Sequence, residues 1–247
     1  MSNPIRLERK YYSLFKRALL QQVQPALEML GTGAGEASAS AITTDPIRRV
    51  YMQLFKEVVS KNAARQYKEI QSQYKATNDY WELTATDFFQ RYGTMKIVSI
   101  TGTTRNYYLQ LVRQITIQAN SLGLGMFDTA KWIQKEVGKT WADQTFYRAE
   151  RIARTETGAA ANYGTYAGAT ATGRKDLRKV WKTNMDGRER ESHAAANGQQ
   201  VGIDENFTVG NSSLKYPNDY SGAAADIINC RCVANYITPM NPDYGKA

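Results

Sequence analysis

The side chains with the most distinctive chemistry in this 247-residue chain lie in its last third. The only histidine, His193, and the only two cysteines, Cys230 and Cys232, all fall between residues 181 and 232. Imidazole nitrogen and thiolate sulfur are preferred ligands of Zn²⁺ in proteins. These three residues could therefore hold a structural zinc ion.

Two interpretations of this set remain open at the level of sequence. For zinc, the fourth ligand would have to come from Asp186, Asp219 or water, and the Cys-x-Cys spacing is tighter than the usual spacing of structural sites. In the competing interpretation, Cys230 and Cys232 are small buried residues on one strand face, and His193 is hydrogen bonded to a backbone group. A disulfide across Cys-Arg-Cys would be strained, which favours a reducing compartment.

A run of charged residues precedes the histidine. Together with His193, the residues Asp186, Arg188 and Arg190 form a polar cluster that resembles an acid–base site, but no nucleophile or second tuned group accompanies it. We expect these side chains instead to make charge-assisted hydrogen bonds that fix their turn against the segment containing Asn229 and Arg231.

A second polar pair lies upstream, in residues 146–168. Arg154 and Glu156 belong to a stretch whose first half is charged and amphipathic and whose second half is rich in alanine and glycine. Such small residues allow another backbone to approach closely. We expect a buried structural helix with a salt-bridged edge here, rather than a catalytic site.

The hydrophobic pattern places these residues in an α+β fold. Apolar residues recur at three- and four-residue intervals, which predicts further helices over 5–30, 46–74, 84–92, 105–122 and 128–138. The glycine-rich stretch at about 31–44 predicts a flexible linker, and residues 95–100 predict a strand or an extended link.

Alternation begins after Lys175 and predicts short strands over 179–185, 199–201, 206–209 and 227–237. We therefore expect a mainly helical N-terminal body with long helices, residues 1–145. A small α+β domain with a few short antiparallel strands, residues 146–247, should follow it.

The chain is basic, with 32 Lys and Arg residues against 23 Asp and Glu residues, a net charge of +9. The exposed side of the first helix would carry Arg6, Arg9, Lys10, Lys16 and Arg17. These cations could contact DNA or a portal protein, although a solvated charged face is the more common explanation. No run of about 20 apolar residues and no signal peptide is evident, so we expect neither membrane insertion nor Sec export.

The order of the C-terminal segments resembles the phage Mu F-like, or phage head morphogenesis, family of minor capsid proteins. The segments are ARTETGAAANYG, a strand with tryptophan, DGRERESH followed by NGQQV, then FTVG, and finally YPNDYSGAAADIINCRC. The agreement covers about residues 148–233, a third of the chain. Five segments in register make the composite specific, whereas Asn-Cys-Arg-Cys alone would be weak.

The resemblance implies a structural protein of the virion, not an enzyme, with no cofactor beyond the zinc already considered. Its implied partners are the portal protein and capsid or other head proteins, in several copies per particle. Assembly would take place in the host cytoplasm without a membrane, at the portal vertex or the capsid interior. Some relatives contact packaged double-stranded DNA or leave with it, and the positive charge suits that position.

Two alternatives belong to other classes. The first is a metal-dependent nuclease or transferase that uses Arg154 and Glu156 with His193, Cys230 and Cys232. The second is a DNA-binding protein without enzymatic activity, whose affinity would fall steeply with salt.

Overall fold

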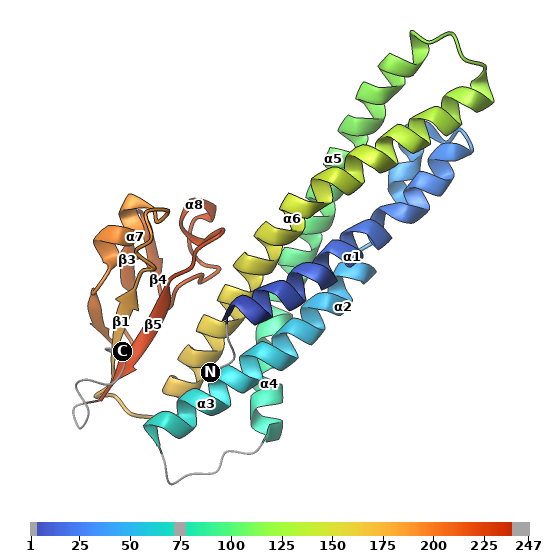
Figure 1. Cartoon of the computed structure of the whole chain (residues 1–247). Helices are drawn as coiled ribbons and strands as arrows, with labels where there is room; N and C mark the ends of the chain where they lie inside the picture. The colour runs from blue at the N-terminus through green and yellow to red at the C-terminus, as the bar shows by residue number, and fades with distance from the viewer. Residues whose placement is uncertain (1–3, 72–77, 239–247) are drawn as a thin grey trace. The chain divides into compact units, whose positions relative to one another are not determined.

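The structure, a computed structural model, describes residues 4–71 and 78–238, and it is mainly helical with short strands near its C-terminal end (Figure 1). This arrangement confirms the predicted α+β class. Among the described residues, contacts group 4–52 with 90–150 in one unit, and 53–89 with 151–238 in a second. The units therefore differ from a simple division at residue 145, because residues 53–89 belong with the C-terminal strands.

The first unit is helical. It is built from α1 (Pro4–Gly31), the first part of α2 (Asp45–Leu54), α5 (Thr94–Asn120) and the first part of α6 (Met126–Thr170). The apolar stripe expected on the first helix is buried, including Tyr11, Phe15 and Leu19. Phe15 meets Tyr51 edge to face, and the Trp141 indole donates a hydrogen bond to the Leu19 carbonyl. These contacts confirm the predicted helix over residues 5–30.

The prediction of a flexible linker at residues 31–44 was wrong. Residues Gly35–Ala41 form a 3₁₀ helix, η1, in which Ser38 and Ala39 are buried. The Ser38 hydroxyl lies 2.8 Å from the Tyr108 hydroxyl, and Arg113 forms an ion pair with Glu36. Small side chains here allow close packing against α1 and α5, and composition alone does not separate that role from flexibility.

The expected extended link at residues 95–100 was also wrong. These residues lie inside α5, which follows α4 (Asn78–Phe88) and a single π-helical turn, η3 (Phe89–Gly93). Ile97 is buried, so tertiary packing has overridden the β preference of the Ile and Val residues in this stretch. The helices predicted at 128–138 and 146–168 are confirmed, and both are parts of one continuous helix, α6.

The second unit contains a close contact between helices. The helix predicted over 46–74 is formed by α2, a π-helical turn η2 (Phe55–Val59) and α3 (Ser60–Ile70), and residues 72–74 lie outside the described residues. Gly164 and Gly168 of α6 lie against this segment. A Cβ atom added at Gly168 would stand 2.2 Å from the Ala63 carbonyl oxygen, so only glycine fits. The small-residue half of α6 thus allows the expected close backbone approach.

The strands of the second unit surround a small apolar core. Within the described residues, β1 (Arg178–Lys182) is the central strand between β2 (Gln200–Gly202) and β5 (Val233–Ile237), with both neighbours antiparallel. A separate ribbon pairs β3 (Phe207–Val209) with β4 (Ser212–Leu214). Two short helices complete the unit, α7 (Glu191–Ala196) and α8 (Ala224–Ile227).

Trp181 on β1 and Phe207 on β3 meet edge to face in this core. The strand predicted over 227–237 is confirmed only for its second half. Residue Ile227 ends α8, and residues 228–232 are irregular before β5 begins.

The glycine contact predicts opposite effects of adding a methyl group at two helical positions. Gly168→Ala should lower the free energy of unfolding by about 1–3 kcal/mol, because the new Cβ overlaps the Ala63 carbonyl. Gly102→Ala in α5 should raise it by about 0.5–1 kcal/mol, because that Cβ meets nothing within 4 Å. Urea unfolding of both variants measures this, and equal shifts of the same sign would contradict the packing described.

Candidate metal centre

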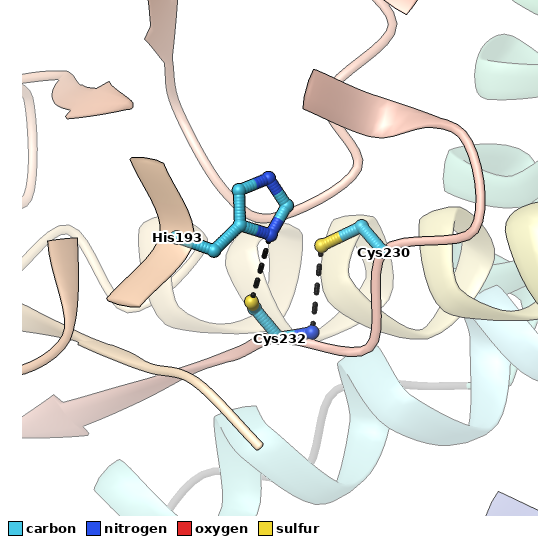
Figure 2. Close-up of side chains that lie close together, drawn as sticks. All are labelled: His193, Cys230 and Cys232. Carbon is cyan, nitrogen blue, oxygen red and sulfur yellow. Dashed lines mark hydrogen bonds between the residues drawn. The ribbon is translucent and has the colours of Figure 1, made fainter. Parts of the chain in front are cut away.

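The structure brings His193, Cys230 and Cys232 together. His193 lies on α7, and the two cysteines lie in the irregular segment between α8 and β5. Their ligand atoms lie within 4.8 Å of one another, and each residue is at most 3% exposed. Figure 2 shows the imidazole Nδ1 facing the sulfur atoms, with Nδ1 at 3.4 Å from Cys232 Sγ.

The surroundings differ from those of an ordinary core histidine. The Nε2 atom of His193 is buried without a hydrogen-bond partner among the described residues. The expectation of a backbone partner for the ring was wrong, since its partner is the Cys232 sulfur. The cysteines do not alternate on a strand face either, because both precede β5.

The two thiols have opposite acidities. A hydrogen bond from Cys230 lowers the pKa of Cys232 to about 5, with His193 and Thr183 adding to the effect against the cost of burial. The same pairing with Cys232, together with burial, raises the pKa of Cys230 far above its usual value. These opposite shifts favour the thiolate on Cys232 over that on Cys230, and thiolate is the form that binds metals.

A small cavity of about 20 Å³ adjoins the cluster, and its walls include Thr183, Glu189 and Arg190. This volume is enough for about one water molecule. Neither aspartate considered as a fourth ligand belongs to the cluster. Asp186 is held by arginine side chains, and Asp219 accepts hydrogen bonds from the backbone amides at positions 215 and 221.

Two asparagines hold the cysteine segment in place. The Asn218 amide nitrogen donates to the carbonyls of Ile227 and Cys230 at 3.0 and 3.3 Å. The Asn162 amide nitrogen, on α6, donates to the Cys232 carbonyl at 3.1 Å and to the Asn218 amide oxygen at 3.2 Å. All the N–H groups of both side chains are thereby used, and both residues are buried.

Residue Asn229, at the start of Asn-Cys-Arg-Cys, is attached to α6 as well. Its backbone has a positive φ of 61°, and its N–H donates to the Thr155 hydroxyl at 2.9 Å. Arg154 donates to the Asn229 side-chain oxygen at 3.0 Å. On the same helix, the buried Glu156 accepts a hydrogen bond from the Tyr220 hydroxyl. Both residues considered as catalytic candidates therefore make structural contacts.

The charged turn before α7 contacts the same segment. Arg231 donates to both carboxylate oxygens of Asp186, and Arg188 donates to one of them. These contacts hold the pKa of Asp186 well below its usual range, with Arg231 the largest cause. Arg190 donates to the Ile228 carbonyl at 2.5 Å. The polar residues singled out from sequence thus lie around one loop.

Sequence reasoning did not find the roles of Asn162, Asn218, Thr155 and Lys179. Asn218 has a φ of 63° within the predicted Tyr-Pro-Asn-Asp turn, so its conformation was foreseeable but its amide contacts were not. Lys179 is fully buried and donates to the carbonyls at positions 205 and 215, and burial lowers its pKa to about 8. A lysine on the inward face of an alternating strand was the available signal.

The profile of the family described as Phage Mu protein F like protein matches residues 110–235, about half of the chain. The chain belongs to this family, which is a family of phage head morphogenesis proteins. The match includes the asparagine pair, the charged turn and the cysteine segment.

A curated relative carries a different kind of name. The chain is 30% identical over 149 residues to a protein of Enterococcus faecalis named NAD(+)–arginine ADP-ribosyltransferase EFV. The alignment covers 57% of this chain and 29% of the relative, so the chain spans less than a third of that protein's length. No solved structure matches the chain. Over the described residues, none of the helices combines the length and apolar character required to cross a membrane.

The asparagine contacts predict a stability effect that backbone conformation does not explain. Asn218→Gly keeps a residue that tolerates positive φ but removes the side-chain hydrogen bonds to the carbonyls of residues 227 and 230, and the first of these then retains only the longer bond from the Cys230 N–H at 3.4 Å. We expect it to lower the free energy of unfolding by about 2–4 kcal/mol. The control Asn211→Gly, at an exposed turn position, should change it by less than about 1 kcal/mol. Similar losses in the two variants, measured by urea unfolding, would contradict a special role for Asn218.

Proposed function

We propose that this protein is a minor head protein of a tailed bacteriophage, which associates with the portal and the capsid interior during head assembly. The observation that carries the proposal is the family match over residues 110–235, which includes the whole network around the cysteine segment. Several copies would enter each head in the host cytoplasm, and the protein would remain in the virion. Its task would be architectural.

An exposed apolar cluster in the first unit supports a contact with another head protein. It lies where α5 and α6 are joined by a short turn (Figure 1), and we call it the hairpin tip. Its members are Ile117, Leu122, Leu124, Met126 and Phe127, which are between 40% and 78% exposed. Exposed apolar groups gathered in this way are typical of protein–protein contact sites. The portal is the partner that we assign to the tip.

The basic side of α1 supports a position close to DNA. Arg6, Arg9, Lys10 and Arg17 are exposed, and Lys16 is half-buried. Cations along one helix face attract phosphate mainly through the release of counterions, and this attraction needs no specific sequence. We propose that this face contacts packaged double-stranded DNA. A purely DNA-binding protein remains the alternative, and it would retain DNA affinity without joining particles.

Several observations support an architectural role over a catalytic one. The cavity beside His193 is about 20 Å³, whereas sites for small ligands usually measure several hundred cubic ångströms. Arg154 and Glu156 contact Asn229 and Tyr220. A larger open depression of about 590 Å³ is lined by residues such as Lys56 and Trp81, and none of the residues proposed for catalysis belongs to its walls.

The relative named as an ADP-ribosyltransferase is the observation that favours the enzyme alternative. Incubation of the purified protein with NAD⁺ and free arginine should release no nicotinamide, and incubation with plasmid DNA and Zn²⁺ should produce no nicks. Turnover in either assay that disappears in His193→Ala, but persists in the control Asn211→Gly, would favour the enzyme.

The hairpin tip provides the test of assembly. Phe127→Asp introduces a charge into the tip and should reduce co-purification with portal protein from disrupted heads by about tenfold or more. Leu83→Asp is the matched control, because Leu83 is an exposed apolar residue in α4, away from the tip in sequence. Absence of the unaltered protein from both procapsids and mature particles would refute the proposed function.

A further inference from the structure

We propose that His193, Cys230 and Cys232 bind one Zn²⁺ ion, with a water molecule as the fourth ligand, and that this ion joins α7 to the cysteine segment. The three ligand atoms already face one another (Figure 2). The inference is independent of the role in head assembly, because it rests only on the residues around this cluster.

The distances fit a tetrahedral ion. With Zn–N near 2.0 Å and Zn–S near 2.3 Å, tetrahedral angles place a nitrogen and a sulfur ligand about 3.6 Å apart and two sulfurs about 3.8 Å apart. Here Nδ1 of His193 lies 3.4 Å from Cys232 Sγ, and no pair of ligand atoms is more than 4.8 Å apart. Binding therefore requires a contraction of at most about 1 Å along the longest edge, which side-chain rotation can supply.

The chemistry of the ligands selects the metal. Two thiolates and an imidazole suit Zn²⁺, whereas Mg²⁺ and Ca²⁺ prefer oxygen ligands. Two thiolates also balance the charge of Zn²⁺, so the complex adds no net charge to a buried site. Without a metal, the same place holds two buried sulfur atoms beside a buried imidazole.

The fourth zinc ligand is inferred from the space beside the cluster. No further His, Cys, Asp or Glu of the described residues joins the cluster, and the adjoining cavity has room for about one water molecule. A substrate would not fit there. We therefore infer a structural ion, even though three protein ligands plus water is the ligand count of catalytic zinc sites.

Such an ion would reinforce a segment that is already held from its other side. Cys230 and Cys232 are attached through their carbonyls to Asn218 and Asn162. Among the described residues, no side-chain hydrogen bond joins α7, the helix of His193, to those asparagines. The His193 carbonyl instead accepts a hydrogen bond from the Thr183 hydroxyl. Zinc would add a direct link between α7 and the cysteine segment.

The first test uses the full-length chain without a histidine tag. Elemental analysis of protein purified without chelators should find about one zinc per chain. After the zinc is removed with a chelator, titration with Co²⁺ should produce thiolate-to-cobalt charge-transfer absorption that saturates at one equivalent and disappears when Zn²⁺ is added. A chain that is folded by circular dichroism, yet contains no zinc and gives no such absorption, would overturn the proposal.

Variants identify the ligands. Cys232→Ser and His193→Ala should weaken Co²⁺ binding by more than about 100-fold, because each removes a direct ligand. Glu189→Gln is the matched control, since Glu189 lines the same cavity but is outside the cluster, and it should bind Co²⁺ normally. Cys230→His retains a ligand and should still bind one Co²⁺ with weaker charge-transfer absorption, so it remains informative if the other variants fail to fold. Unchanged Co²⁺ affinity in Cys232→Ser would show that Cys232 is not a ligand and would contradict the proposed site.

Discussion

The segment from Asn229 to Cys232 belongs to no helix or strand although both of its cysteines are buried, and the C-terminal network depends on this constraint. A buried carbonyl or amide without a partner costs roughly 1–3 kcal/mol, so an irregular segment of this kind requires partners from elsewhere. Side chains supply them. Asn218 donates to the carbonyls of residues 227 and 230, and Asn162 donates to that of residue 232. The Thr155 hydroxyl accepts a hydrogen bond from the backbone N–H of residue 229.

Three stretches that are far apart in the sequence meet at this loop. The helix segment with Arg154 and Asn162, the turn with Asn218, and the charged turn with Asp186 all contact one short loop. The loop in turn places the two sulfurs opposite the only histidine. Polar residues that resemble an active site in the sequence thus make contacts that hold this loop, both to its side chains and to its backbone, which suits a protein whose family serves head morphogenesis.

Sequence patterns predicted the parts of the fold that depend on local periodicity. The stripe of α1 and the alternation of β1 were recognisable because one face of each element is buried. The buried 3₁₀ helix η1 was not, because small residues permit both close packing and flexibility, and the helical state of residues 95–100 depends on distant contacts. For the site, residue types identified the possible metal ligands, but the donors Asn162 and Asn218 lie far apart in sequence and only the fold brings them together.

The most direct test of this interpretation is hydrogen exchange at the amide of Asn229, which donates a hydrogen bond to the Thr155 hydroxyl. In the unaltered protein this amide should exchange as slowly as the amides of β5, although it lies outside any strand or helix. In Thr155→Val, which keeps the side-chain shape but removes the acceptor, it should exchange much faster while β5 stays protected. Rapid exchange in the unaltered protein would contradict the claim that side chains from α6 hold this segment in place.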